Sequence, residues 1–176
     1  MGFFKKINCF FDRFSHDIKL FNTKASLILA GIGVLLGILS WLAGGRADRV
    51  MLLYMFPRSA LSLGMMYFLW ALSFAFIGLI IGGVAFGCEK YKRKEAMKVV
   101  TFLILSFVLT LLLYCVFFKF SAPFIAFIVI LFAEIFCILA LMASLRFNSL
   151  WSLCLIIHLI WLFYNGYLAF TIALIN

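Results

Sequence analysis

The chain has 176 residues, of which 68% are hydrophobic, and its mean hydropathy is +1.24. Globular domains are about 45–50% apolar, so this composition leaves no room for a second, soluble domain. The net charge is +9, from 15 Lys and Arg residues against 6 Asp and Glu. Because the basic residues flank apolar stretches, we interpret them as orienting the chain and attracting anionic lipid, and we expect no nucleic-acid partner.

A basic, aromatic leader is predicted at residues 1–24, where five Lys and Arg residues alternate with phenylalanines. Its phenylalanine spacing is compatible with a short helix on the cytoplasmic leaflet, and a flexible tail is the alternative. The apolar run that follows imitates a signal peptide. At 20 residues it exceeds the roughly 7–15 residues of a signal core, so we expect a retained first helix.

Five apolar stretches follow one another along residues 25–176, which we treat as one transmembrane domain. Each stretch reaches the ~20 residues that a helix needs to cross a bilayer. None shows the sustained polar–apolar alternation of a barrel strand, so the expected fold class is all-α: an integral membrane bundle of five transmembrane helices. The predicted spans are 25–44, 62–87, 99–120, 122–145 and 150–175.

The distribution of positive charge predicts the orientation of the bundle. Eleven of the Lys and Arg residues lie in the leader, the 88–98 connection and the fourth connection, against four in the 45–60 and third connections. The positive-inside rule therefore predicts a cytoplasmic N-terminus in a multi-pass cell-membrane protein, with Asn176 on the opposite side. The short third and fourth connections predict that the last three helices pack as sequential antiparallel neighbours.

Small residues recur at spacings of three and four on the first, second and fourth predicted helices. In lipid, such stripes mark positions where helix backbones approach closely. We expect these seams to lie inside one chain, and a homodimer seam is the alternative. The stripes include Gly33 and Gly37, then Gly78 and Gly82, then Ala126, Ala133, Cys137 and Ala140.

The fifth helix carries a face that mixes aromatic rings with hydrogen-bonding groups, including His158, Trp161 and Asn165. Polar groups at membrane depth usually turn toward the bundle interior, and an aromatic cavity with a few polar anchors is typical of a small-molecule site. An ordinary helix–helix interface is the alternative. Glu134 lies near the middle of the fourth helix, at a depth from which it can reach His158. A buried hydrogen bond between them is favoured over a proton relay.

The sequence holds none of the familiar catalytic motifs. There is no nucleophile elbow, zinc-binding helix, phosphate-binding loop or cysteine spacing for a metal, and the five cysteines are expected to be reduced. Only one acidic residue lies deep in a span, so the sequence lacks the second carboxylate that a paired-carboxylate mechanism or a two-metal site requires. We expect no metal site and no catalytic residues, so an enzyme is the less favoured class.

Local motifs give the chain a resemblance to the TspO/MBR family, the tryptophan-rich sensory proteins and mitochondrial translocator proteins, also called peripheral benzodiazepine receptors. Pro57-Arg58, followed by a helix with Tyr67-Phe68-Leu69-Trp70, is similar to the family's proline-containing start of helix 2. Val116-Phe117-Phe118 resembles its W-x-x-x-FF signature. The segments Tyr164–Ala169 and Ala173–Asn176 resemble its closing P-Y-x-x-W-x-x-x-A-x-x-LN. The similarity covers about residues 25–176 and leaves the leader outside.

The resemblance implies a homodimeric bundle that binds a hydrophobic or tetrapyrrole-type ligand, such as a porphyrin or haem, under the 45–60 loop, in a sensory or translocator role. Most of the family's tryptophans are replaced, as at Leu113 and Leu168, so we do not carry over its porphyrin degradation. The alternative is a small proton-coupled transporter or an accessory subunit, with Glu134 and His158 as the buried ionisable groups. The predicted ligand-binding residues are Tyr54, Phe56 and Arg58 in the lid, Tyr67, Trp70 and Tyr114 as walls, and His158, Trp161 and Asn165 as polar anchors.

Overall fold

The computed structural model of the chain describes residues 22–44, 54–87, 93–145 and 149–176. Within these ranges it is an all-α bundle of five helices, each long and apolar enough to cross a membrane. The predicted fold class is therefore confirmed. Residues 1–21 of the leader, 45–53 of the first loop, Cys9 and Cys88 lie outside the described residues. The helices are α2 (Thr23–Gly44), α4 (Leu63–Phe86), α5 (Arg93–Tyr114), α6 (Pro123–Ser144) and α7 (Ser149–Ile175).

The third helix is longer than its apolar stretch. It begins at Arg93, six residues before the predicted start at Val99, and Glu95 bonds to Lys98 at 2.9 Å one turn later. Hydropathy marks where hydrocarbon begins, whereas the helix continues into the polar interface, where charged side chains remain solvated. At its other end α5 widens into a π-helical turn, η2 (Cys115–Lys119). The other four predicted spans agree with the helices to within two residues.

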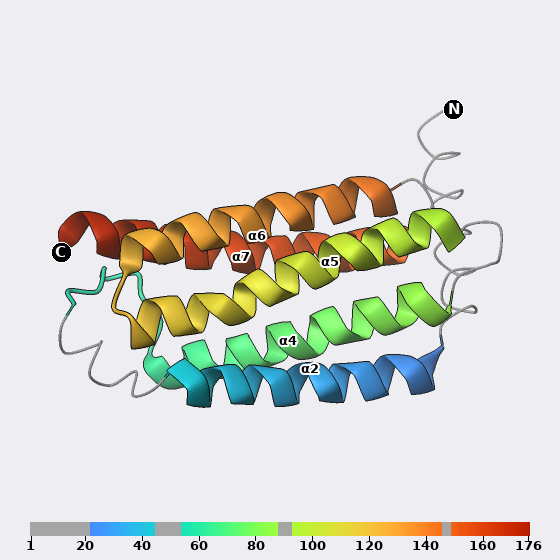
Figure 1. Cartoon of the computed structure of the whole chain (residues 1–176), viewed down its shortest axis with the longest axis horizontal. Helices are drawn as coiled ribbons and strands as arrows, with labels where there is room; N and C mark the ends of the chain where they lie inside the picture. Colours follow the sequence, from blue (N-terminus) through green and yellow to red (C-terminus); the bar gives the residue numbers. More distant parts are fainter. Residues whose placement is uncertain (1–21, 45–53, 88–92, 146–148) are drawn as a thin grey trace, which may run out of the picture.

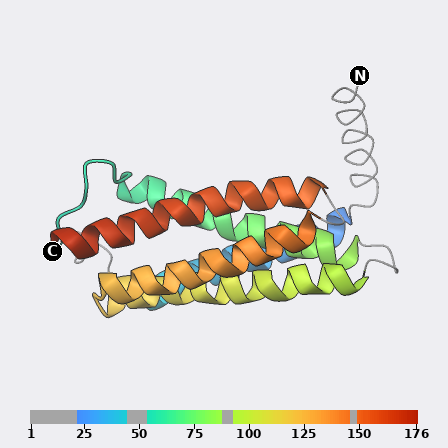
Figure 2. The same cartoon turned by 90° about the horizontal axis from the view of Figure 1, so that it is seen from above.

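The bundle has two parts that run side by side (Figures 1 and 2). Helices α5, α6 and α7 pack in sequence as antiparallel neighbours, as predicted, while α2 packs on α4. Helix α4 also contacts α5 and α7 and joins the two parts. The lid segment, which we define as residues 54–62, lies at the end of the bundle where α7 ends.

The small-residue stripes form seams inside the chain, as expected. A Cβ added to Gly78 would collide with the backbone of Leu29, and one added to Gly33 would collide with the carbonyl oxygen of Phe74. The backbones of α2 and α4 therefore touch through these glycines. On α6, the whole stripe of Ala126, Ala133, Cys137 and Ala140 is fully buried.

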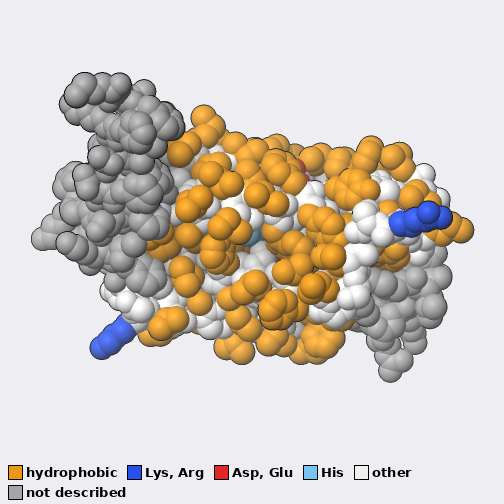
Figure 3. Space-filling view, turned by 180° about the vertical axis from the view of Figure 1, so that it is seen from behind, with side chains coloured by type: hydrophobic (Ala, Val, Ile, Leu, Met, Phe, Trp, Pro, Cys, Tyr) orange, Lys and Arg blue, Asp and Glu red, His pale blue; other side chains and the backbone are white. Residues whose placement is uncertain are grey.

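The outer surface has the pattern of a chain surrounded by lipid. On the face shown in Figure 3, hydrophobic side chains cover the middle of the molecule and the described Lys and Arg side chains lie at its two ends. Such a band matches the hydrocarbon core between two polar interfaces. The fold defines a multi-pass membrane protein.

Candidate functional site

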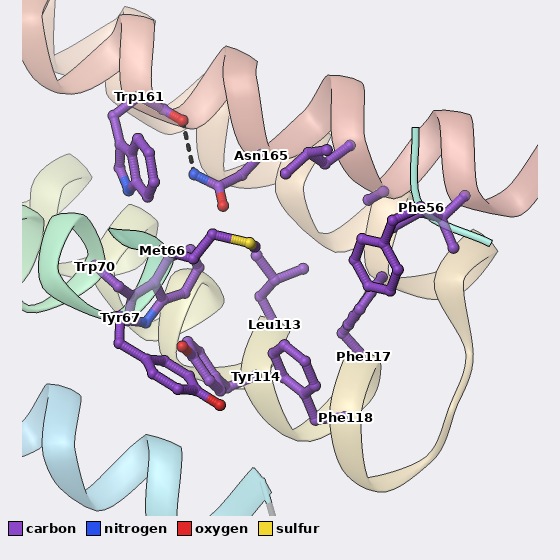
Figure 4. A pocket seen from close by; sticks show the side chains of 13 residues that line it. Phe56, Met66, Tyr67, Trp70, Leu113, Tyr114, Phe117, Phe118, Trp161 and Asn165 are labelled. Carbon is purple, nitrogen blue, oxygen red and sulfur yellow. Dashed lines mark hydrogen bonds between the residues drawn. The ribbon is translucent and has the colours of Figure 1, made fainter. Parts of the chain in front are cut away.

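An aromatic pocket lies near one end of the bundle, where α4, α5, η2 and α7 meet beneath the lid segment (Figure 4). Its walls are mostly apolar and aromatic, and Asn165 contributes the one amide side chain among the described lining residues. The lining side chains are Phe56 from the lid segment, Met66, Tyr67 and Trp70 from α4, Leu113 and Tyr114 from α5, Phe117 and Phe118 from η2, and Trp161, Asn165, Leu168, Ala169 and Ile172 from α7.

The end of α5 shapes one wall of the pocket. Tyr114, Phe117 and Phe118 are spaced so that they share one helical face, and their rings contact one another at centroid distances of 5.0 and 4.9 Å. The π-helical turn ends at Lys119 and is capped by Phe120, whose N–H donates to the carbonyl of Cys115 at 3.1 Å. Single π turns often occur at functional sites because they redirect side chains locally.

Two tryptophans form the inner wall. The rings of Trp70 and Trp161 meet edge to face with centroids 6.3 Å apart, and Trp70 also meets Tyr114 at 4.7 Å. Both indole Nε1 atoms are buried, and no described residue accepts a hydrogen bond from either. A buried tryptophan N–H normally has a partner, so these two donors are suited to an acceptor on a bound molecule.

Asn165 provides the complementary group. Its Nδ2 donates to the carbonyl oxygen of Trp161 at 2.7 Å, which fixes the orientation of the amide. Its Oδ1 points into the pocket (Figure 4). The lining side chains therefore carry two unpartnered N–H donors and one carbonyl acceptor, and none of the described residues that line the pocket is charged.

Hydrogen bonds tie the lid segment to the end of α7. The hydroxyl of Tyr164 accepts from the backbone N–H of Leu61 at 3.0 Å, and the side chain of Asn176 bonds to both backbone groups of Met55. The hydroxyl of Tyr54 donates to the carbonyl of Ser121 at 2.6 Å, at the turn between η2 and α6. These bonds hold the segment across the pocket with Phe56 directed inward.

The structure brings six of the nine predicted ligand-binding residues together. Phe56, Tyr67, Trp70, Tyr114, Trp161 and Asn165 all line the pocket. Tyr54 and Arg58 belong to the lid segment without lining the pocket: Tyr54 anchors the segment and Arg58 is exposed. His158 also lies outside it, one turn of α7 before Trp161, where its Nδ1 bonds to the Ser73 hydroxyl on α4 at 3.1 Å.

Sequence reasoning missed seven lining residues, all of them apolar: Met66, Leu113, Phe117, Phe118, Leu168, Ala169 and Ile172. Five of them, Leu113, Phe117, Phe118, Leu168 and Ala169, belong to the motifs of the family resemblance. No polar atom distinguishes the seven from residues that face lipid. Helical spacing was the available signal, since Leu168, Ala169 and Ile172 continue the face of Trp161 and Asn165.

The two buried ionisable groups do not meet. Glu134 is only 6% exposed, and its Oε1 would lie 2.6 Å from a Cβ added to Gly166. His158 lies eight residues earlier on α7, about 12 Å along the helix at 1.5 Å per residue. Among the described residues, Glu134 makes no ion pair or hydrogen bond, so the expected bond to His158 is absent.

Other reactive groups give no alternative site. Within the described ranges, no three His, Cys, Asp or Glu side chains lie close enough to hold a metal ion. Cys115, Cys137 and Cys154 are free thiols.

Comparison with known proteins gives no family for the chain. A scan against protein-family models finds no match, and a search of curated proteins finds no significant relative.

Proposed function

We propose that the chain is a TspO/MBR-like membrane protein that binds a hydrophobic small molecule in the aromatic pocket, in a sensory or translocator role. The observation that carries this proposal is the pair of buried indole N–H groups of Trp70 and Trp161, which have no acceptor among the described residues and belong to side chains that line the pocket. An interface evolved only for packing gains nothing from two unpaired donors, because each costs about 1–3 kcal/mol when buried without a partner.

The pocket geometry constrains how a ligand binds. The enclosed volume is about 40 Å³, whereas ligand pockets typically measure about 300–1,000 Å³. A tetrapyrrole therefore requires the lid segment or the aromatic walls to move. Arg58 in that segment is exposed and can pair with a ligand carboxylate at the pocket mouth, while the uncharged interior receives the hydrophobic body.

The test is saturable binding by the purified protein in detergent. Protoporphyrin is titrated while tryptophan fluorescence is followed in a Trp41→Phe/Trp151→Phe background, where only the two pocket tryptophans report. We expect saturable quenching, weakened by Asn165→Ala or by Phe56→Ala. Quenching that rises linearly without saturation, or that Asn165→Ala leaves unchanged, contradicts the proposal. A neutral porphyrin without carboxylates tests whether Arg58 contributes.

We further propose that the lid segment faces the non-cytoplasmic side and that the leader is cytoplasmic, from the distribution of positive charge. A cysteine placed at Ser59, in a variant without native cysteines, is then labelled by an impermeant maleimide from outside intact cells. Labelling only after lysis reverses the assignment.

A proton-coupled transporter or accessory subunit is the alternative, favoured by the buried carboxyl of Glu134. Because Glu134 and His158 are not in contact, a proton cannot pass directly from one to the other, and each would have to act separately in a proton path. Transport predicts pH-dependent flux in proteoliposomes that Glu134→Gln abolishes, whereas ligand binding at the aromatic pocket is independent of Glu134.

A further inference from the structure

A groove lies on the outer side of the aromatic pocket, between α2 and α4. Its volume is about 270 Å³, and we name it the α2–α4 groove. Its lining includes two small residues, Ala71 on α4 and Gly37 on α2, and the ring of Phe74 packs against Gly37, where a Cβ would lie 2.6 Å from it. Ile38 and Phe68 contribute larger side chains that are 42% and 63% exposed.

The inner wall of the α2–α4 groove is also a wall of the aromatic pocket. Tyr67, Trp70 and Tyr114 line both hollows. Trp70 and Tyr114 lie between the two hollows. They are only 6% and 4% exposed, so little of either ring is accessible from them. A molecule that fills the groove therefore lies against the small part of these two rings that remains exposed.

The surroundings and the lining of the groove define its occupant. Its exposed side chains belong to two membrane-spanning helices, so the medium around them is hydrocarbon. Among the described residues no charged side chain lines the groove, and its side-chain polar atoms are the hydroxyl and indole N–H groups of Trp41, Tyr67, Trp70 and Tyr114. A charged lipid head group therefore has no ionic partner there. If the hollow is empty, the side chains that line it lose dispersion contacts. A lipid acyl chain is as apolar as leucine, so it can fill the hollow without a desolvation cost.

We propose that the α2–α4 groove is a binding site for one acyl chain of a bilayer lipid, with the chain packed against Trp70 and Tyr114. The site is independent of the proposed ligand in the aromatic pocket. It places membrane lipid in direct contact with the rings that form the ligand pocket wall, and a filled groove restrains those rings from moving outward.

Fluorescence quenching by brominated lipid tests this proposal. The protein is reconstituted in phosphatidylcholine that carries bromine atoms midway along one acyl chain. In the Trp41→Phe/Trp151→Phe/Trp161→Phe variant, only Trp70 reports. We expect Trp70 to lose most of its fluorescence relative to unbrominated lipid, although it is almost completely buried within the protein.

Trp151 supplies the matched control. It is 3% exposed, similar to Trp70, but it packs against Gly83, away from the groove. A variant that retains only Trp151 should keep most of its fluorescence in the same brominated lipid. Equal quenching of the two tryptophans overturns the proposal, because it shows that burial alone sets the effect. Unquenched Trp70 overturns it as well, as expected if a second copy of the chain covers the groove.

A substitution that fills the groove provides the second arm. Ala71→Leu should protect Trp70 from bromine quenching, whereas Leu72→Phe, on the lipid-facing neighbour that does not line the groove, should not. If these variants fail to fold, the wild-type protein can be labelled with a lipid that carries a photoreactive diazirine in its acyl chain. Labelling of Trp70 or Tyr114 supports the proposal, and labelling confined to exposed side chains contradicts it.

Discussion

Trp70 on α4 and Trp161 on α7 meet edge to face, with ring centroids 6.3 Å apart, and the Nε1 atom of each is buried without an acceptor among the described residues. The two residues are 91 positions apart in the chain, so the pairing depends on the packing of α4 against α7. The pair forms the inner wall of the aromatic pocket.

Replacing Trp161 by phenylalanine should weaken ligand binding more than it weakens the fold. The change removes a donor that has no acceptor among the described residues, so no hydrogen bond of the ligand-free structure is lost there. A ligand acceptor loses a bond of about 0.5–1.5 kcal/mol, which corresponds to a roughly two- to tenfold rise in Kd. Quenching of the remaining tryptophans by protoporphyrin measures this Kd.

The control for this substitution is Trp151→Phe, a buried tryptophan that does not line the pocket. It should leave the Kd unchanged while it removes comparable ring volume. If both variants weaken binding equally, the effect is a general loss of packing, and Trp161 is not a ligand donor.

The sequence predicted the helices well because the bilayer imposes their length. Four spans agree with the structure to within two residues, since both ends of an apolar run coincide with the limits of the hydrocarbon. The start of α5 was predicted six residues late because Arg93, Lys94 and Lys98 are helical without being apolar. Hydropathy alone cannot locate a helix end that lies in the polar interface.

The pocket was predicted less completely because its membership depends on which apolar residues face inward. Polar or aromatic character identified Asn165, Trp161 and Tyr114, but Leu113 and Ile172 are indistinguishable by type from lipid-facing neighbours. The partner of His158 was also mispredicted. The prediction compared how deep Glu134 and His158 lie in the membrane, but it did not consider which way each helix turns its side chain. His158 bonds instead to Ser73 on α4.

Gly78→Ala should destabilise the bundle by separating α2 from α4. The added Cβ would collide with the backbone of Leu29 and lie 2.9 Å from the Cα of Ala30, and a backbone cannot move aside as a side chain can. Overpacking of this kind costs about 1–3 kcal/mol. Gly31→Ala on α2 is the matched control, because its Cβ meets nothing within 4 Å. Thermal unfolding in detergent should show a lower Tm for Gly78→Ala only; equal Tm values would contradict the seam.

Tyr164→Phe should loosen the lid segment without altering the helices. The hydroxyl accepts from the backbone N–H of Leu61 at 3.0 Å, and a bond of this kind contributes about 0.5–1.5 kcal/mol. Amide hydrogen exchange at Leu61 should therefore accelerate. Tyr167→Phe is the control, because its hydroxyl bonds to the Ser59 side chain at 3.1 Å and, within the described part of the chain, to no backbone N–H. If Leu61 exchanges at the same rate in wild type and Tyr164→Phe, the tyrosine does not restrain the lid.

Glu134 and Gly166 should behave as a coupled pair. A Cβ at residue 166 would lie 2.6 Å from Oε1 of Glu134, so Gly166→Ala should lower the Tm of the wild-type protein. In a Glu134→Ala background, where the carboxyl group is gone, the same substitution should cost much less. A double-mutant cycle measured by thermal unfolding gives the coupling energy directly, and additive effects would show that the two residues do not touch.

Glu134→Gln keeps the size of the side chain and removes any charge that it carries. A charge at the centre of a membrane helix costs at least about 2.5 kcal/mol. We therefore expect equal or greater thermal stability and an unchanged Kd for protoporphyrin, because Glu134 does not line the aromatic pocket. Glu134→Asp is the control that retains the charge on a shorter side chain. A variant that binds ligand normally but loses a pH-dependent flux present in wild-type proteoliposomes would favour the transporter over the binding protein.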